Sequence, residues 1–268
     1  MISAGIASVG LVGPGLDNWD AAKGLIRSGE AYDPGQTVSL GASALLPPNE
    51  RRRTTALIQM VLQCCDDTLR LSGPDHSLDL PGVFACSCGD LDVVDRILVA
   101  LTQPDKPVSP TLFHNSVHNA PAGYLSIATS NRAPSTSISA HDGSFVAGLL
   151  EAVSQVRESN NRVLLVAYDG ATPTNLQPFR PRTTSFAVGL LLTPEQASGI
   201  ARLDVDLAEE GPIDRMAQAG FETLRAGNPA ARSLPLLERI ATGTDAEVHI
   251  PYLDGRRARI RVIAGESR

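Results

Sequence analysis

The chain lacks the features that mark several broad classes of protein. No apolar stretch approaches the roughly 20 residues that a membrane-spanning helix needs. No basic residue precedes the first apolar run, so we do not interpret the N-terminus as a secretory signal. The net charge is −6 and the basic residues are scattered, which leaves no patch for a phosphate backbone. We predict a cytoplasmic protein with no membrane span and no nucleic-acid partner.

Cysteine is also scarce. The four thiols stand at positions 64 and 65 and at positions 86 and 88. These spacings match neither a disulfide framework nor the paired gaps of a zinc site. We interpret them as reduced, small buried side chains, the first pair in a surface helix and the second in an early strand. The sequence predicts no cofactor and no metal.

The first two-thirds of the chain alternate strand-like apolar runs with segments of helical period. This pattern is typical of an α/β domain with a largely parallel sheet. Strands are predicted at 6–12, 82–86, 163–168 and 186–192, helices from near 19, 47, 90 and 142, and a loop over 104–121. The helix over 142–158 has a wide apolar face and small residues at Gly143, Ala147 and Gly148, so it should be buried and central.

Beyond Pro194 the pattern changes. An alternating run around Val205 precedes two short amphipathic helices, and Asp254-Gly255 separates two apolar runs as a hairpin turn. We therefore predict a domain over 1–195 and an extension over 196–268 that packs on it.

One stretch carries a family resemblance. Residues 108–152 read VSPTLFHNSVHNAPAGYLSIATSNRAPSTSISAHDGSFVAGLLEA. Their order resembles the ketosynthase segment that runs from a Ser-Pro loop through an Asn…Ala-Gly…Ser-Ile helix to the strand-to-helix junction bearing the nucleophile. The opening GIASVGLVGPGLDNW resembles the first strand and turn of the same family. The resemblance implies an α/β protein with the N-terminal half of a thiolase-like (ketosynthase) fold and a small α/β C-terminal extension.

A narrower likeness lies in residues 45–53 and 113–124. They resemble short β-ketoacyl synthase-like proteins of aryl polyene pigment pathways, described as chain length factors. The resemblance implies an inactive member of an acyltransferase family. Such a subunit pairs with an active β-ketoacyl synthase and shapes chain length in fatty-acid or polyketide-type biosynthesis. The implied partners are that synthase, or a second copy of the chain, and an acyl carrier protein.

The expected nucleophile is missing. A condensing enzyme needs a thiolate at the start of a buried helix, where the helix dipole and free N–H groups lower the thiol pKa. In the family this cysteine follows Thr-Ala, and placing Ser139-Ala140 on that pair puts His141 at its position. After Pro194 the sequence has neither the His-Gly-Thr-like motif nor the Asn-x-Phe-Gly-like loop of the family. The resemblance therefore implies a chain that is not catalytic alone.

The resemblance also indicates other candidate residues. The tunnel or partner-facing wall would include Phe113, His118, Asn119 and Tyr124. The basic run Arg51, Arg52 and Arg53 could receive an acidic carrier protein, although such a run more often forms a solvated helix face.

Histidines raise two further alternatives. His114 and His118 are four apart and on a helix could share a metal, but the loop prediction favours polar packing near a subunit interface. His141 could fill the vacated nucleophile pocket.

His141 could instead act with Asp142 or Ser144 in a stand-alone acyl-thioester hydrolase or acyltransferase. A homodimeric acyl-chain binding protein is a third possibility. The accessory subunit is our leading hypothesis, because an unpaired sheet edge and an apolar helix face need covering in water.

Overall fold

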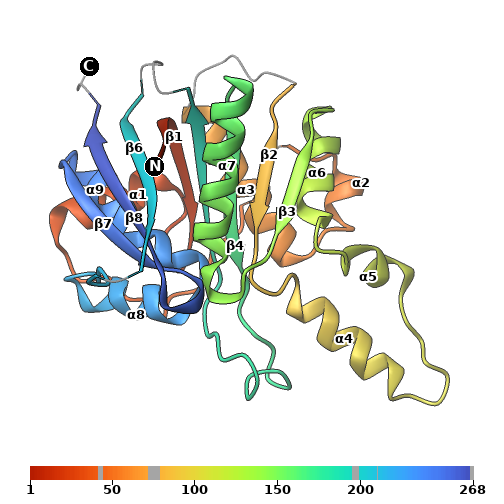
Figure 1. The fold of residues 1–268 in the computed structure, drawn as a ribbon. Helices are drawn as coiled ribbons and strands as arrows, with labels where there is room; N and C mark the ends of the chain where they lie inside the picture. The colour runs from red at the N-terminus through yellow and green to blue at the C-terminus, as the bar shows by residue number, and fades with distance from the viewer. Residues whose placement is uncertain (42–44, 72–78, 195–198, 210, 266–268) are drawn as a thin grey trace.

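The structure is a computed structural model that describes residues 1–41, 45–71, 79–194, 199–209 and 211–265. One mixed sheet forms its centre (Figure 1), with the strand order β3-β2-β4-β5-β1-β6-β8-β7. The strands are β1 (Ile2–Val12), β2 (Gly82–Ala85), β3 (Ser135–Ile138), β4 (Val163–Asp169), β5 (Phe186–Thr193), β6 (Ala201–Ala208), β7 (Ala246–Pro251) and β8 (Arg257–Ala264). This architecture confirms the predicted α/β class.

The prediction of a largely parallel sheet is wrong. Among the described strands, only β2 pairs in parallel, with β3 on one side and β4 on the other. Strand β5 follows β4 through a loop, and the two run antiparallel, as do β5 with β1 and β1 with β6. A parallel pair needs a long crossover, usually helical, and the described residues between β4 and β5 form no helix.

The helices largely follow the predicted pattern. They are α1 (Trp19–Ser28), α2 (Pro48–Arg51), α3 (Ala56–Leu71), α4 (Leu91–Leu101), α5 (Pro110–Asn115), α6 (Ala120–Thr129), α7 (Ser144–Ser159), α8 (Ala219–Gly227) and α9 (Leu234–Thr242). Asp90 caps α4 by accepting a hydrogen bond from the Val93 N–H at 3.3 Å. Within the described ranges, no helix is long and apolar enough to cross a bilayer.

Two helix predictions need correction. The segment from Pro47 is not one helix, because α2 ends at Arg51 and α3 begins at Ala56; its predicted end at Gly73-Pro74 lies outside the described residues. The segment over 104–121 is not all loop. It contains α5, where Pro110 occupies a first-turn position that needs no backbone donor.

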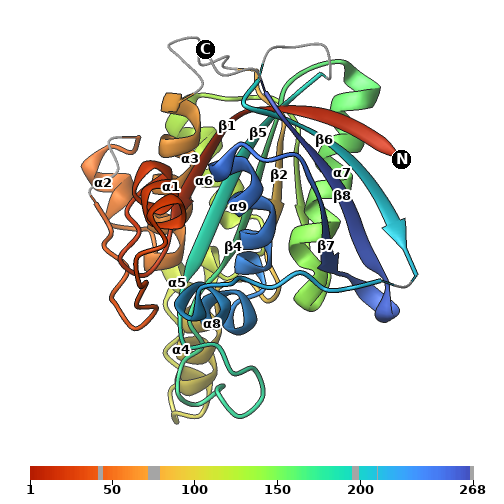
Figure 2. The ribbon, with the colours of Figure 1, turned by 90° about the vertical axis from the view of Figure 1, so that its left-hand side faces the viewer.

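Two apolar cores flank the sheet. Helix α7 packs on one face, with Phe145, Leu149 and Val153 buried among strand residues (Figures 1 and 2). Helix α3 covers the other face together with α6. The close approach of α7 requires Gly148, because a Cβ there would lie 2.7 Å from the Cβ of Ala85. The predicted buried, central helix is confirmed.

The C-terminal strands continue the same sheet. Ile6 of β1 lies opposite Ala201 of β6, and the β7–β8 hairpin completes that side. Asp254 and Gly255 both have positive φ at its turn, as an Asp-Gly hairpin predicts. Helix α9 packs against α1, where Arg27 donates to the Ala241 carbonyl at 2.5 Å. Strands from both sides of residue 195 therefore belong to one sheet. The predicted domain boundary at that residue stays a prediction.

Candidate functional site at the start of helix α7

The junction between β3 and α7 forms a tight turn at one end of the sheet. A single 3-10 turn (His141–Gly143) links the two elements, and His141 has a φ of 50°. The Ser144 hydroxyl donates to the His141 carbonyl at 2.6 Å and accepts from the Ala140 N–H at 3.0 Å. These two bonds fix the turn and leave the Ser144 hydroxyl no free role.

The side chain of His141 points away from the body of the protein. It is 68% exposed, and its Nδ1 lies 3.5 Å from the Asp142 carboxylate. The alternative in which His141 fills a vacated pocket is therefore wrong for this chain, because the left-handed backbone turns the ring outward. Its equivalence to the nucleophile of a condensing enzyme stays a prediction.

Asp142 is held by two arginines. Arg180 donates to its Oδ1, and Arg232 Nη2 donates to its Oδ2 at 2.8 Å. A second donor of Arg232 reaches the Asp142 carbonyl at 3.0 Å. Burial alone would raise the pKa of Asp142, but the hydrogen bond and charge of Arg180 and the charge of Arg232 outweigh it and lower that pKa. The carboxylate is thus ionised and already paired.

A second carboxylate lies at the end of β4 and is almost completely buried. Asp169 accepts hydrogen bonds from Arg182, from the Ser87 hydroxyl and from the Ser87 N–H. Arg182 also donates to Ser87 Oγ at 2.9 Å and to Thr172 Oγ1 at 3.2 Å. Burial raises the pKa of the Asp169 carboxyl, and the Arg182 charge and the Ser87 bonds oppose that shift. This pair ties the loop after β4 to the end of β2.

A thiol also belongs to this end of the sheet. Ser139 Oγ donates to the Ser87 carbonyl at 2.9 Å, so the residues after β2 lie against those after β3. Arg180, which binds Asp142, also interacts with Cys88. Burial alone would lower the pKa of Arg180, but Asp142 and then Cys88 raise it. The expectation that all four cysteines lie away from residue 141 is therefore wrong for Cys88, because parallel pairing of β2 and β3 brings together residues about 50 positions apart.

The other cysteines are fully buried. Cys64 and Cys65 lie on the side of α3 that packs against the sheet, and the prediction that they are small buried thiols is confirmed. Burial raises the pKa of Cys64, Cys65 and Cys86. Cys88, in contrast, is only partly buried.

The residues predicted for the partner-facing wall divide into two groups. Phe113 on α5 and Asn119 are exposed, and His118 is half-buried with its Nε2 3.2 Å from the Cys86 carbonyl. Tyr124 is buried, and its hydroxyl donates to Asn115 Oδ1 at 3.2 Å. The prediction that Tyr124 faces a partner is not supported by this geometry, because its ring belongs to the core beneath α6.

The structure does not favour a metal at the histidine pair. His114 packs edge-on against the Tyr124 ring at 6.2 Å between centroids, and His118 is engaged with a carbonyl. In the part of the chain that the structure describes, no cluster of three or more metal-ligating side chains occurs.

The basic run lies at the end of α2. Arg52 and Arg53 are exposed, Arg51 is half-buried, and Arg53 lies 3.6 Å from Glu50. Arg51 and Arg52 border a surface hollow of about 400 Å³. Docking of a carrier protein here remains a prediction.

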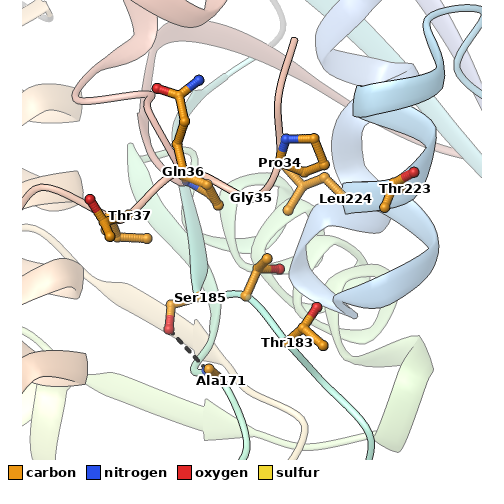
Figure 3. Close-up of a pocket in the computed structure, with 12 residues that line it drawn as sticks. Pro34, Gly35, Gln36, Thr37, Ala171, Thr183, Ser185, Thr223 and Leu224 are labelled. Atoms are coloured by element: carbon orange, nitrogen blue, oxygen red, sulfur yellow. Dashed lines mark hydrogen bonds between the residues drawn. The ribbon is translucent and has the colours of Figure 1, made fainter.

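Sequence reasoning missed a cavity of about 540 Å³ (Figure 3). It lies between the segment at Pro34–Val38, the start of β5 and helix α8. The side chains of Gln36, Thr183 and Thr223 line it with amide and hydroxyl groups. None of the described residues that line it has an ionisable side chain. Ser185 accepts from the Ala171 N–H at 2.9 Å at its edge. These residues come from distant segments, so no local pattern could have indicated them.

Comparison with known proteins identifies the family of the chain. A family model described as the β-ketoacyl synthase N-terminal domain matches residues 18–248. The chain belongs to this family. The predicted thiolase-like fold is thereby confirmed. A search of curated proteins finds no match.

Solved structures give the same fold. A chain from the complex of the ketosynthase ApeO with its chain length factor ApeC, from Xenorhabdus doucetiae, is 24% identical with a TM-score of 0.76, over 97% of this chain and 100% of that one. The ishigamide ketosynthase/chain length factor gives 14% identity and a TM-score of 0.74, over 98% and 99%. The type II polyketide complex AntDE:AntF, an acyl carrier protein with its ketosynthase bound to the hexaketide, gives 13% and 0.78, over 98% and 99%.

Proposed function

We propose that this chain is an accessory subunit that pairs with an active β-ketoacyl synthase and shapes product length in polyketide-type biosynthesis, of the aryl polyene kind. The observation that carries the proposal is that a histidine, His141, stands where the family's nucleophilic cysteine is expected. It opens the turn into the buried helix α7, where a condensing enzyme would hold its thiolate. The likeness over nearly the whole chain to members of ketosynthase/chain length factor complexes supports the same role.

The exposed surface beside this turn supports a partner. Among the strands that the structure describes, β3 is an edge of the sheet and pairs with β2 alone, so its outer backbone groups are open to another chain. Phe113, Val117 and Ile127 on or next to α5 and α6 are large apolar side chains that remain exposed. Exposed apolar side chains and an open sheet edge are both features that a subunit interface would cover.

The geometry counts against a hydrolase that uses His141. Ser144 is buried and both bonds of its hydroxyl go to the backbone of its own turn. Asp142 is bound on both oxygens by Arg180 and Arg232, and its Oδ1 lies 3.5 Å from His141 Nδ1, beyond the usual length of a hydrogen bond that would orient the imidazole. His141 is left without the hydrogen-bonded partner that such chemistry needs.

The test is co-expression with the ketosynthase of the same pathway. We would measure complex formation by size exclusion with mass analysis and product length by a malonyl-condensation assay. Phe113→Asp should abolish or strongly weaken the heterodimer. Phe179→Asp is the matched control, because Phe179 is also highly exposed, at 84% against 68%, but lies on the loop between β4 and β5.

A heterodimer that is lost only in Phe113→Asp, with a change in product length, would support the proposal. A chain that never binds the synthase, or that cleaves thioesters alone in a reaction lost in His141→Ala, would refute it. Equal loss in both phenylalanine variants would place the contact elsewhere than at α5.

Carrier-protein docking at α2 is a finer part of the proposal. Reversing two charges in Arg51→Glu/Arg52→Glu should raise the KM for acyl carrier protein without loss of the heterodimer, because docking of an acidic partner is electrostatic. Arg157→Glu/Arg256→Glu makes the same charge change at two exposed arginines outside α2. An equal rise in both double variants would show only a general charge effect.

A further inference from the structure

Two neighbouring cavities at one end of the sheet share part of their walls. The larger chamber has a volume of about 540 Å³ and the smaller chamber about 250 Å³. Val38, Ala171 and Ser185 line both, so the two chambers adjoin along these residues. The larger chamber alone has the size of a typical small-molecule site, which is about 300–1,000 Å³.

Strand direction places the larger chamber where ligands commonly bind. Strands β1 and β4 both run antiparallel to β5, so their carboxyl ends lie at the same edge of the sheet, where β5 begins. Pro14 lies just after β1, Ala171 just after β4 and Ser185 just before β5, and all three line this chamber. A crevice outside the carboxyl ends of strands is a common ligand site in open α/β sheets.

Neutral hydrogen-bonding groups line the larger chamber. Figure 3 shows Gln36, Thr183 and Thr223 around it, on segments that are far apart in the sequence. Pro34 and Leu224 add apolar contact. Because none of its described lining residues is ionisable, a charged ligand group would lose hydration there without gaining a counter-charge. This wall therefore suits a neutral group that carries several hydroxyls.

The smaller chamber has a mainly apolar wall. Leu40, Leu57 and Met60 line it, and the last two come from α3, which covers the face of the sheet opposite α7. Asp90 and Asp92 at the start of α4 also line the chamber, and their carboxylates disfavour an anion. An uncharged apolar chain fits these surroundings.

Ser185 lies at the junction of the two chambers. It is half-buried, and its oxygen accepts a hydrogen bond from the Ala171 N–H at 2.9 Å (Figure 3). A hydroxyl that accepts one hydrogen bond keeps its own proton for another, so Ser185 can donate to a ligand oxygen. Its place between a polar and an apolar wall matches the ether oxygen that links a polar head group to an alkyl chain.

We propose that the two chambers bind a neutral amphiphile with a hydroxyl-rich head group, of the alkyl glycoside class. The head group occupies the larger chamber, the alkyl chain occupies the smaller one, and Ser185 donates to the oxygen between them. This site goes beyond the proposed accessory role, because no part of it depends on a synthase partner.

The probe is octyl glucoside, used below the concentration at which it forms micelles. Its binding to the full chain is measured by isothermal titration calorimetry. Octyl sulfate and octyltrimethylammonium carry the same alkyl chain with an anionic and a cationic head group. We expect octyl glucoside to bind about tenfold more tightly than either, because the larger chamber offers no counter-charge to a charged head group.

Two alanine variants test the location of the site. Ala171 is exposed and lines both chambers, so Ala171→Leu fills their junction. The added side chain should weaken binding of octyl glucoside by about tenfold. Ala217→Leu makes the same change at an exposed residue outside both chambers and should leave the affinity unchanged.

Ser185→Ala tests the hydrogen bond at the junction. In octyl thioglucoside a sulfur, which is a weak acceptor, replaces the ether oxygen of octyl glucoside. Loss of one neutral hydrogen bond should weaken binding of octyl glucoside by about fivefold and change binding of octyl thioglucoside by less than about twofold. Circular dichroism and thermal melting show that each variant is folded.

Four results would overturn the proposal: no binding of octyl glucoside, equal or tighter binding of a charged amphiphile, equal affinity of the two alanine variants, or an equal effect of Ser185→Ala on the two glucosides. Heterodimer formation by Ala171→Leu is measured in parallel. If this variant loses the glucoside but still pairs with the synthase, the binding site and the accessory function are independent, so the two ideas fail separately.

Discussion

Two aspartate–arginine groups lie at the same end of the sheet, and they differ mainly in burial. The Asp169–Arg182 pair is buried, with side chains 1% and 2% exposed, and its bonds tie three segments together. Asp142, in the turn before α7, is 35% exposed and binds two arginines, Arg180 and Arg232. Loss of one partner from a buried ion pair strongly destabilises the fold, because the other charge stays buried without compensation. In a half-exposed ion pair, water solvates the remaining charge and the loss is smaller. The first group is therefore structural, and the second can change partners at low cost.

A third pair extends this comparison to a more exposed arginine, because Arg259 is 45% exposed against 17% for Arg180 and 22% for Arg232. Arg259 of β8 donates to Asp206 of β6 at 2.8 Å, and the two residues lie opposite each other across the strands. The Arg259 hydrogen bond lowers the pKa of Asp206. Asp206 is 36% exposed, close to the 35% of Asp142, so these two aspartates differ mainly in the number and the exposure of their arginine partners.

The largest effect should come from Arg182→Met. It leaves Asp169 buried without its cation, and we expect the free energy of unfolding to fall by about 3–5 kcal/mol. Urea denaturation followed by circular dichroism measures the change. A loss of stability smaller than that of Asp142→Asn would contradict the comparison.

A smaller loss should follow when both charges are removed. In Asp169→Asn/Arg182→Met no uncompensated charge remains, and the amide can keep an acceptor for the Ser87 bonds. We expect the double variant to be more stable than Arg182→Met alone in the same urea experiment. If the loss of stability in the double variant equals the sum of the losses in Asp169→Asn and Arg182→Met, the two side chains are not coupled and the structural role of the pair is contradicted.

Asp142→Asn should cost about 1 kcal/mol, the upper end for exposed pairs, after allowing for solvent screening. The effect has a definite dependence on pH. The folded-state pKa is lowered, so the contribution is complete above the ordinary carboxyl pKa of about 3.9 and is lost as the pH falls through the folded-state value. The difference between wild type and Asp142→Asn should stay constant near neutral pH and shrink below about pH 4. A difference that grows on acidification would contradict this sign.

The smallest effect should come from Asp206→Asn in β6, because Asp206 is bound by one arginine that is itself 45% exposed. Water and salt screen this pair, so we expect a change in stability smaller than that of Asp142→Asn and further reduced by added salt. Thermal melts at low and high salt measure it. A loss as large as that at Asp142 would show that the number and the exposure of the arginine partners do not set the energy.

Local pattern predicted much of the fold correctly. The apolar run of β1, the helical spacing of α1, the small residues of α7 and the Asp-Gly turn of the last hairpin each depend on neighbours within a few positions. The candidate site was predicted only in part. His141 was placed at the start of α7, but Cys88, Arg180 and Arg182 were not connected to it, because these residues are brought together by strand pairing and by a long loop.

The sequence by itself therefore determined most of the element types, the family and the absence of a cysteine at position 141, because each of these is carried by short-range spacing or by residue identity. Only the tertiary structure decided strand direction, the burial of Tyr124, the outward turn of His141 and the place of Cys88 beside that turn. These properties depend on which distant segments pack together and exclude water, and that is settled by the free energy of the whole fold rather than by any local stretch.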